Sequence, residues 1–489
     1  MSTSRSRFLL PFALASLPAG LVASAAAAVF QGNGIKLGEV TADSVVVWTR
    51  LTAAPEAKWD GAAWVTPANP PGQRATESDW NWRVQLPPGR AVKDMVGALP
   101  GAPGAVQVTV AAADGSSRIQ IPWTDVRTER DHTRQFALDR LRPGTRYEVT
   151  VESRDPRGVA GPTERGSFRT APARDATTPV RFAVVTCGDY PRRDDPVNGH
   201  RIYAAMRQLA PDFMVHTGDV EYYDKADPWA TTPELARFKW NRLYALPYLR
   251  AFHRETAAYF TYDDHDILRN DCWPGLTYGD LTFEAGVGIF HEQTPSGPLP
   301  YRTVRHGRDL QIWITEGRVA RSPNTDPDGP AKTILGAVQK AWLKRTIAES
   351  DATFKVLLSP TPYVGPDRGN KRDNHANVGF KAEGDELRRF LGAQPNLVVV
   401  NGDRHWQYRS VDPVTGLREF GCGPSSDVHA GGYTPQPGDD AVQKFFRLKG
   451  GFITVTVERI NGSPRMSVRH HDVAGAVVHE TPILPARGG

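Results

Sequence analysis

The prediction of the fold starts from Pro211-Asp-Phe-Met-Val-His-Thr-Gly-Asp-Val-Glu-Tyr-Tyr223. The run from Phe213 to His216 is short and apolar, as in a buried strand, and Thr217-Gly218 ends it. Asp219 lies where the strand gives way to a loop, and Tyr222 follows closely. Open α/β sheets bind ligands at the carboxyl ends of their strands, so a carboxylate and a phenol there are well placed to hold a hard cation. The alternative is an aspartate that caps a helix and a tyrosine that covers the core.

Three further apolar runs in the second half of the chain end in unusual polar clusters. These clusters are Cys187-Gly-Asp-Tyr190, Asp263-Asp-His-Asp266 and Asn401-Gly-Asp-Arg-His-Trp406. If the strands are parallel neighbours, their carboxyl ends meet in one crevice and gather a thiol, several carboxylates, a phenol and two imidazoles. Anionic ligands at this density repel one another unless cations neutralise them. The sequence therefore predicts a metal site.

The chain divides into two predicted domains after the first 28 residues. Residues 29 to 172 are expected to form a β-sandwich, because short strand-like runs alternate with Pro, Gly and Asp clusters. Within them, Leu141-Arg-Pro-Gly-Thr-Arg-Tyr147 resembles the turn-and-tyrosine signature of fibronectin type III-like domains, and residues 54 to 79 are interpreted as a long loop. Composition changes near residues 170 to 179. From 173 to 489 strands alternate with helices, which predicts a mostly parallel sheet with helices on its faces.

Local patterns predict the individual elements. The strands expected in the first domain are Ser44–Arg50, Trp82–Leu86, Val106–Val110, Arg118–Pro122 and Arg146–Val151. The helices expected in the second domain cover residues 196–209, 230–252, 339–349 and 384–391.

Composition and charge exclude several classes of protein. The sequence has 489 residues, 40% of them apolar and 23% charged, and a formal net charge of +5 without a basic stripe, so no nucleic-acid-binding module is indicated. Residues 1 to 28 are typical of a secretory signal, because Arg5 and Arg7 precede an apolar stretch and small residues. A membrane anchor is the alternative, although Pro and Gly interrupt the segment. No later stretch approaches the roughly 20 apolar residues of a membrane span, so a secreted or periplasmic soluble protein is expected.

Cysteine is sparse, with only Cys187, Cys272 and Cys422. Because three is an odd number, at least one thiol is free or bound to something else. Cys272 and Cys422 could pair in an oxidising compartment, but the sequence does not decide this.

The polar clusters stand in the order of a known superfamily. Cys187-Gly-Asp-Tyr190, Gly218-Asp-x-x-Tyr222, Tyr262-Asp-Asp-His-Asp266 and Gly402-Asp-x-His405 together resemble the calcineurin-like metallophosphatases and, within them, the alkaline phosphatase D (PhoD-like) family. Ala42-Asp-Ser-Val-Val-Val-Trp-Thr-Arg-Leu51 is similar to the opening of that family's first domain. The resemblance implies a metallophosphatase core of mixed β-sheets flanked by helices, preceded by a small fibronectin type III-like sandwich.

The resemblance also implies two kinds of metal ion. A ferric ion would be held by Cys187, Asp219, Tyr222 and His405. Asp219 would bridge to a divalent ion, calcium, that Asp264 and Asp403 also bind, because carboxylates in place of neutral nitrogen ligands favour calcium over zinc. The alternatives are an inert buried thiol at Cys187 and turn-capping roles for Asp219 and His405.

Other residues near these ligands have weaker assignments. Asp189 and Glu221 are candidates for a further calcium ion. For Asp263 and Asp266, a structural role is as good an explanation as metal binding. Only one of the two residues before His265, Asp263 or Asp264, needs to face the metals. The superfamily usually supplies another histidine ligand between the third and last clusters, and His375 is the only nearby option.

The resemblance assigns catalytic roles to three residues. His265 would bind a phosphoryl oxygen or protonate the leaving group, and a core histidine is the alternative. Arg404 and Arg318 are candidate phosphate clamps, although strand alternation would turn Arg404 to the other face unless the loop twists. The segment Lys371–Asn377, with Asn374 and His375, is either a substrate loop or a solvated surface loop.

The implied reaction is hydrolysis of a small-molecule phosphate monoester or diester, in which a metal-bound hydroxide attacks phosphorus directly. Gly423-Pro-Ser-Ser426 does not form a nucleophile elbow, so no serine nucleophile is expected. A phospholipase D-like phosphodiesterase is one alternative, since Trp273 and Trp406 could form an apolar rim for a lipid. A non-catalytic secreted binding protein is another alternative. Arg5 and Arg7 are separated by Ser6, which departs from the family's twin-arginine signal. The oligomeric state is not predicted.

Overall fold

The computed structural model describes residues 29–65, 85–297 and 299–485. The predicted secretory signal lies outside these residues, as does most of the predicted strand Trp82–Leu86, whose last two residues are not in a strand. Within the described ranges, no helix combines the length and the apolar character needed to cross a membrane.

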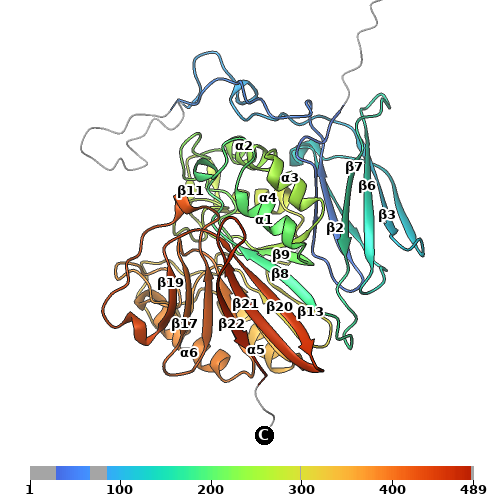
Figure 1. Cartoon of the computed structure of the whole chain (residues 1–489). Coiled ribbons are helices and arrows are strands. Elements are labelled where there is room, and N and C mark those ends of the chain that lie inside the picture. The colour runs from blue at the N-terminus through green and yellow to red at the C-terminus, as the bar shows by residue number, and fades with distance from the viewer. Residues whose placement is uncertain (1–28, 66–84, 298, 486–489) are drawn as a thin grey trace, which may run out of the picture.

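Two large mixed β-sheets form the centre of the molecule (Figure 1). In spatial order, the nine-stranded sheet contains β22 (Val477–Ile483), β21 (Ser463–His471), β20 (Phe452–Ile460), β8 (Val180–Val185), β9 (Phe213–His216), β10 (Ala257–Phe260), β1 (Ile35–Gly38), β2 (Val45–Arg50) and β5 (Thr133–Leu138). The seven-stranded sheet contains β13 (Arg302–His306), β14 (Leu310–Ile314), β15 (Phe354–Ser359), β16 (Leu397–Asn401), β18 (Arg418–Cys422), β17 (Gln407–Val411) and β19 (Gln443–Arg447). The parallel strands are central in both sheets, and antiparallel strands lie toward the edges.

The main core lies between the two sheets. Buried residues of both, such as Phe182 and Val184 of β8 and Ile312 of β14, belong to one apolar cluster. The intervening residues Ala183 and Val185 point to the other face, as the two-residue period of a strand requires, and pack against helices. Both faces of each central strand are therefore buried, which explains their continuous apolar runs.

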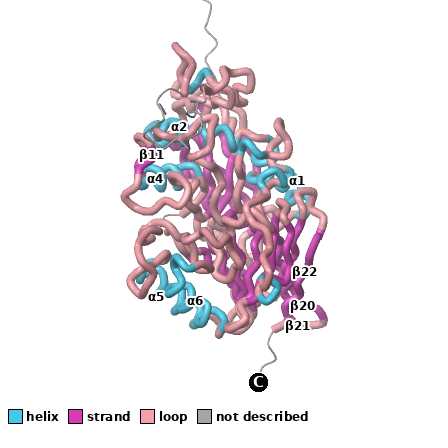
Figure 2. The backbone as a smooth tube through the Cα atoms, turned by 90° about the vertical axis from the view of Figure 1, so that its left-hand side faces the viewer, coloured by secondary structure: helices cyan, strands magenta, loops and turns pink. Residues whose placement is uncertain are grey.

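Helices cover only the outer face of each sheet (Figure 2). The nine-stranded sheet is covered by α1 (Arg201–Leu209), α2 (Pro233–Tyr244), α3 (Pro247–His253) and α4 (Phe283–Gln293). The seven-stranded sheet is covered by α5 (Gly336–Ala348) and α6 (Lys381–Gly392). A short hairpin, β11 (Thr277–Tyr278) and β12 (Leu281–Thr282), precedes α4.

The N-terminal part is all-β and joins the core through its own strands. A four-stranded antiparallel sheet contains β4 (Arg118–Asp125), β3 (Ala105–Ala112), β6 (Arg146–Arg154) and β7 (Glu164–Arg169). Tyr147 on β6 is buried, and its hydroxyl accepts a hydrogen bond from the Arg142 N–H at 2.8 Å, as the turn-and-tyrosine pattern indicates. β1, β2 and β5 instead extend the nine-stranded sheet. The domain boundary at residues 172 and 173 stays a prediction.

The implied fold of mixed sheets flanked by helices, behind an all-β N-terminal part, is confirmed. The expectation of one mostly parallel sheet was wrong, because local apolar runs do not reveal which strands pair, and the strands divide between two sheets. The helix expected from residue 196 begins at Arg201, since the Asp195 side chain accepts hydrogen bonds from the Val197 and Asn198 N–H groups and forms a turn. The helix expected over 230–252 is interrupted before Pro247.

Candidate metal centre

Four loops meet at the carboxyl ends of strands from both sheets. Cys187 follows β8, Asp219 follows β9, and Asp263 and Asp264 come after β10 in the nine-stranded sheet, whereas Asp403 and His405 follow β16 of the facing sheet. Cys187, Asp219 and Asp403 have φ angles of 55°, 58° and 64°. Non-glycine residues rarely adopt this left-handed conformation, and such strain clusters at functional sites.

The four predicted iron ligands lie together. The Cys187 thiol is 3.4 Å from Asp219 Oδ2, and the Tyr222 hydroxyl donates a hydrogen bond of 3.1 Å to the same oxygen. Tyr222 Oη is also 3.4 Å from His405 Nε2. Candidate ligand atoms of Cys187, Asp219 and His405 all lie within 4.8 Å of one another. This group offers sulfur, phenol oxygen, imidazole nitrogen and carboxylate oxygen at one point.

Asp219 also belongs to two neighbouring groups of candidate ligands. One contains Asp264 and His265, and the other contains Asp263 and Asp403, again with ligand atoms within 4.8 Å. Both residues of the Asp263-Asp264 pair therefore face the centre, a point that the sequence left open. Asp219 is the carboxylate common to all three groups, as a bridging ligand would be.

The donor set fits bound cations. Asp219 Oδ1 and Asp263 Oδ2 are buried and have no hydrogen-bond partner in the described structure. Burial, and then the Asp219 carboxylate, raises the pKa of the Cys187 thiol well above its ordinary value. Burial likewise raises the pKa of Asp219, outweighing the attraction of His265, and Asp264 and Asp263 raise it further. A cation at this point would supply the missing partner for these oxygens and favour the ionised thiol and carboxylate.

Asp266 has a structural role beside the centre. Its carboxylate accepts hydrogen bonds from the N–H groups of Asp219, Val220, Glu221 and Asp263, at distances from 2.6 to 3.1 Å. These bonds tie the loop after β9 to the loop after β10. Asp266 therefore holds the backbone that presents Asp219.

His265 is buried and pairs with Asp224. Its Nδ1 is 2.6 Å from Asp224 Oδ1, and its ring packs 4.3 Å from the ring of Tyr222. Burial lowers the pKa of His265, but the carboxylates of Asp224, Asp264 and Asp219 outweigh burial and hold the pKa well above 6.5. With Asp219 and Asp264, His265 also forms one of the three candidate ligand groups.

Arg318 and Arg404 are buried and engaged with carboxylates. Arg318 Nε is 2.5 Å from Asp263 Oδ1, and its NH2 group is 3.6 Å from Asp264 Oδ2. Arg404 NH1 is 2.7 Å from Asp403 Oδ2, and its NH2 group donates to Asp367 at 2.5 Å. Each arginine therefore orients candidate metal ligands, and contact of either one with substrate stays a prediction.

Four other candidate residues are not among the three ligand groups. Among the described residues, Asp189 joins none of these groups, and its Oδ2 is 3.4 Å from Arg192 Nε. His375 pairs with Glu383 at 3.0 Å and stacks on Tyr363, so it does not supply the additional histidine. Asn374 donates to the carboxylates of Asp367 and Asp373, in the network that also binds Arg404. Glu221 is 3.8 Å from Lys239 Nζ, and both side chains are buried.

The structure adds two residues that the sequence did not single out, Asp224 and His429. His429 Nδ1 donates to the Cys187 carbonyl at 3.3 Å, and the His429 ring lies 4.0 Å from the His405 ring. Neither residue directly follows a predicted strand, so the strand-end signal that identified the other ligands was missing. Cys187, Cys272 and Cys422 are all buried and free, so the possible Cys272–Cys422 pair is not formed.

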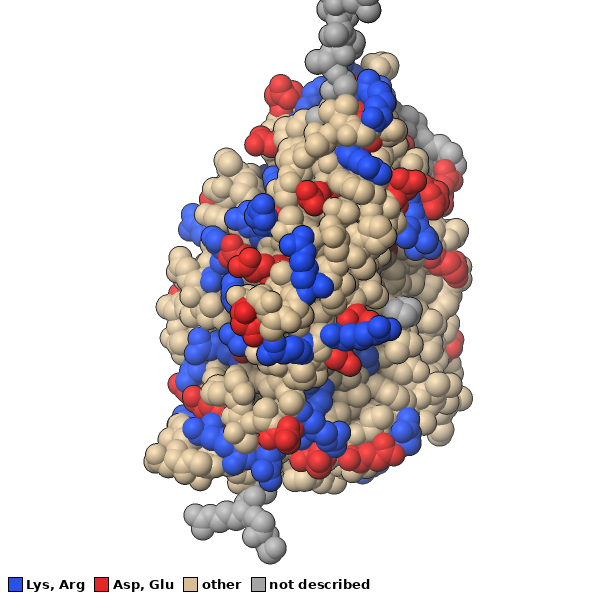
Figure 3. Space-filling model, turned by 90° about the vertical axis from the view of Figure 1, so that its right-hand side faces the viewer, with Lys and Arg blue, Asp and Glu red and all other residues tan. Residues whose placement is uncertain are grey.

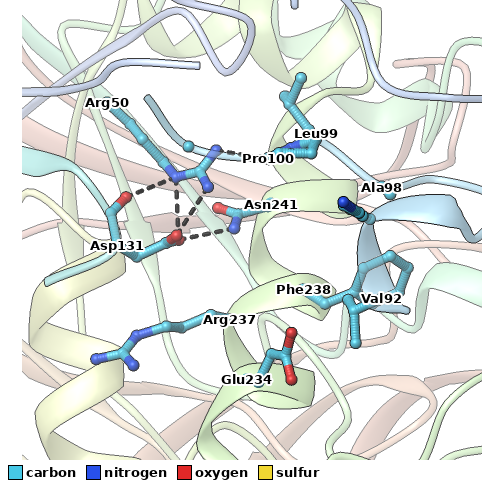
Figure 4. Close-up of a pocket in the computed structure, with 12 residues that line it drawn as sticks. Arg50, Val92, Ala98, Leu99, Pro100, Asp131, Glu234, Arg237, Phe238 and Asn241 are labelled. Atoms are coloured by element: carbon cyan, nitrogen blue, oxygen red, sulfur yellow. Dashed lines mark hydrogen bonds and ion pairs between the residues drawn. The ribbon is translucent and has the colours of Figure 1, made fainter. Parts of the chain in front are cut away.

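A separate cavity of about 250 Å³ lies between the N-terminal part and α2 (Figure 4). Arg50 and Asp131 line it and pair with each other at 2.8 Å, while Asn241 donates to the same aspartate. None of the candidate metal ligands lines this cavity, so the chemistry is not located there.

Two family models match the chain. The model for PhoD-like phosphatase matches residues 182–446, and the model for the PhoD-like phosphatase N-terminal domain matches residues 16–172. The chain belongs to the PhoD-like phosphatase family. The first match spans all four loops of the candidate metal centre, so the family resemblance inferred from the strand-end clusters is confirmed.

Similar proteins agree with this assignment. Alkaline phosphatase D of Bacillus subtilis (strain 168) is 22% identical over 301 residues, which are 50% of this chain and 49% of that protein. The chain thus matches about half the length of this curated relative. A solved structure of PhoD has a TM-score of 0.67 at 18% identity and covers 93% of this chain and 89% of its own. Purple acid phosphatase PPD1 from yellow lupin (Lupinus luteus) seeds has a TM-score of 0.62 at 12% identity and covers 92% and 74%. These structural likenesses show the fold.

Proposed function

We propose that this protein is a metal-dependent phosphoric ester hydrolase that acts on small-molecule phosphate monoesters or diesters. The observation that carries the proposal is the position of Asp219, which is common to three groups of candidate ligands, each within 4.8 Å. A carboxylate shared between cations is typical of two-metal sites that clamp the attacking and leaving oxygens of a displacement. Membership of the PhoD-like phosphatase family supports this reading.

The donor types support Fe³⁺ at one position and Ca²⁺ at the other. Cys187, Tyr222, His405 and Asp219 would hold the ferric ion, since they combine thiolate, phenolate, imidazole and carboxylate donors. Asp264, Asp403 and the shared Asp219 offer only oxygen, which calcium prefers, and Asp263 joins them. When bound, the cations would neutralise the phosphoryl oxygens and lower the pKa of the water that attacks phosphorus.

The side chains around the cations would perform the remaining steps. His265, held by Asp224, would donate a proton to the leaving oxygen as the bond from phosphorus to that oxygen breaks. Arg318 and Arg404 would keep the Asp263, Asp264 and Asp403 carboxylates oriented. Asp189 is retained only as a candidate for a further calcium ion.

The proposal includes a location and a domain division. Residues 1–28 would direct export, so that the enzyme acts outside the cytoplasm. Residues 29–172 would form the N-terminal β domain and residues 173–489 the catalytic domain. Trp406 is buried and stacked 4.7 Å from Tyr433, so it does not contribute to an apolar rim for a lipid substrate, whereas Trp273 is half-buried. A non-catalytic binding protein is disfavoured by the retained ligand set.

The test is turnover of a chromogenic phosphate monoester and diester, p-nitrophenyl phosphate and bis(p-nitrophenyl) phosphate, by the iron- and calcium-loaded protein. Mutating a residue that only orients a metal ligand typically lowers metal affinity or activity by about 10–100-fold. Because Asp219 is itself a proposed shared ligand, Asp219→Asn should lower kcat/KM by more than about 100-fold on both esters. The control is Asp139→Asn, at an exposed position away from the centre, which should leave kcat/KM unchanged. Equal turnover by Asp219→Asn and wild type would overturn the proposal.

A further inference from the structure

An arginine-lined cavity of about 360 Å³ lies between β5, with the turn before it, and the end of α4, with the segment that follows it. Its lining includes Arg127 and Arg130 from the turn before β5, Arg134 from β5 itself, His291 from the end of α4 and Ser296 from the segment that follows α4. None of the candidate metal ligands lines this cavity, so it is a second location on the molecule.

Hydrogen bonds join the turn that carries Arg127 and Arg130 to the start of β5, where Arg134 lies. The Arg127 N–H donates to the Thr133 carbonyl at 3.1 Å, and the His132 N–H donates to the Arg127 carbonyl at 2.9 Å. The Thr133 hydroxyl donates to the Arg130 carbonyl at 2.8 Å. These bonds fix the backbone of the turn. Because that backbone is already ordered, less conformational entropy is lost when the arginines bind a ligand.

The acidic side chains near the cavity are already matched to other cations. Asp131, between Arg130 and His132, turns away and pairs with Arg50 at 2.8 Å (Figure 4). Glu292 lines the cavity, but both of its oxygens accept hydrogen bonds of 2.8 Å from Arg237. Glu129, in the same turn, does not line the cavity.

The three arginines consequently keep their charge uncompensated. Within the described residues, no ion pair joins Arg127, Arg130 or Arg134 to a carboxylate, and Arg134 Nε is buried without an acceptor. An unpaired buried donor costs free energy that a bound acceptor recovers. Guanidinium groups bind the oxygens of phosphate-type anions through paired, charge-assisted hydrogen bonds.

We propose that this cavity binds a free small oxyanion that carries at least two negative charges, of the phosphate or diphosphate type, separately from the metal centre. Ser296 and His291, whose ring Nδ1 is 3.0 Å from the Ser296 hydroxyl, supply neutral polar groups on the opposite wall. Basic and acidic side chains are interspersed on the face shown in Figure 3, without a stripe of one sign. A compact anion fits this local charge better than an extended polyanion.

The test counts binding sites for methylenediphosphonate, a diphosphate analogue whose P–C–P bridge resists hydrolysis, by calorimetry on the metal-loaded protein. Wild type should bind two equivalents, one at the metal centre and one in the cavity. The double variant Arg127→Gln/Arg130→Gln changes two exposed positions. It should bind one equivalent fewer, because the dissociation constant of the cavity rises by on the order of 100-fold. Turnover of p-nitrophenyl phosphate by this variant should be unchanged.

Two further variants separate the sites. Asp219→Asn should lose the equivalent at the metal centre and keep the one in the cavity. Arg140→Gln, at an exposed arginine beyond the other end of β5 and outside the cavity, should keep both equivalents. The proposal is overturned if the cavity variant binds as many equivalents as wild type, or if Arg140→Gln weakens binding as much as the cavity variant does.

Discussion

At the scale of single residues, the centre depends on contacts between side chains distant in sequence. The His429 ring packs on His405, and its Nδ1 donates to the Cys187 carbonyl, so it touches two of the four proposed iron ligands. Cys187 needs this support because its backbone is in the left-handed region, at φ 55°. We interpret His429 as a positioning residue for the iron ligands.

Replacing His429 should loosen the iron site. His429→Phe keeps a ring of similar shape but removes the hydrogen bond to the Cys187 carbonyl, and loss of such an orienting partner lowers metal affinity by about 10–100-fold. Iron retained against a competing chelator measures the effect. His429→Asn, whose side-chain N–H can replace Nδ1, should recover most of the affinity. Full retention by His429→Phe would show that His429 does not position the ligands.

The residue scale also shows where sequence reasoning succeeds. The proximity of Cys187, Asp219, Tyr222 and His405 was predictable because each lies within six residues of the end of an apolar strand, and a strand end fixes the place of the next residues. It was not predictable that both Asp263 and Asp264 face the centre, since the direction of adjacent side chains depends on the turn that carries them. His429 was not predictable because it lies in a short 3₁₀ segment, Asp427–His429, and β18, the strand before this segment, was not among the predicted strands.

At the scale of elements, the loops after β9 and β10 are joined by one carboxylate. Asp266 is fully buried and satisfies four backbone N–H groups of these loops. Because buried donors left without an acceptor cost free energy, the Asp266 carboxylate stabilises both loops.

Asp266→Ala should therefore destabilise the protein. Leaving buried N–H groups unpaired costs about 1–3 kcal/mol each before relaxation and water entry, so we expect a loss of about 3–5 kcal/mol in the free energy of unfolding. Urea unfolding followed by circular dichroism measures it. Asp139→Asn serves as the exposed control and should stay within about 0.5 kcal/mol of wild type. A loss below about 1 kcal/mol for Asp266→Ala would contradict the role in joining the loops.

Element pairing is the part of the fold that local sequence could not supply. The apolar runs of β9 and β16 look alike, yet they lie in different sheets. Strand type follows from composition and period, whereas the partner of a strand follows from long-range packing. The loops nevertheless converge, because the two sheets pack against each other and their strand ends open onto the same site.

At the scale of the whole molecule, several histidines are buried in a neutral state. Burial lowers the pKa of His306 to about 3, and His306 stacks 4.2 Å from Phe213 in the core between the sheets. Burial also lowers the pKa of His470 to about 3. Between pH 6.5 and about 3 the unfolded chain binds protons that the folded chain does not, so stability falls as pH falls through this window.

His306→Phe should reduce this acid sensitivity. One proton taken up only on unfolding changes the free energy of unfolding by up to about 1.4 kcal/mol per pH unit. The variant should lose that contribution between pH 6 and pH 4. Urea unfolding at several pH values, with wild type in parallel, gives the two slopes. Identical slopes would show that His306 is not buried in its neutral form.

The most direct test of the central claim, that four strand-end loops assemble an iron and calcium centre, is metal content and visible absorption of the purified protein. We predict bound iron and calcium, and a visible charge-transfer band from the Tyr222 phenolate to iron that disappears in Tyr222→Phe. A colourless protein that takes up neither metal when both are supplied would contradict the claim.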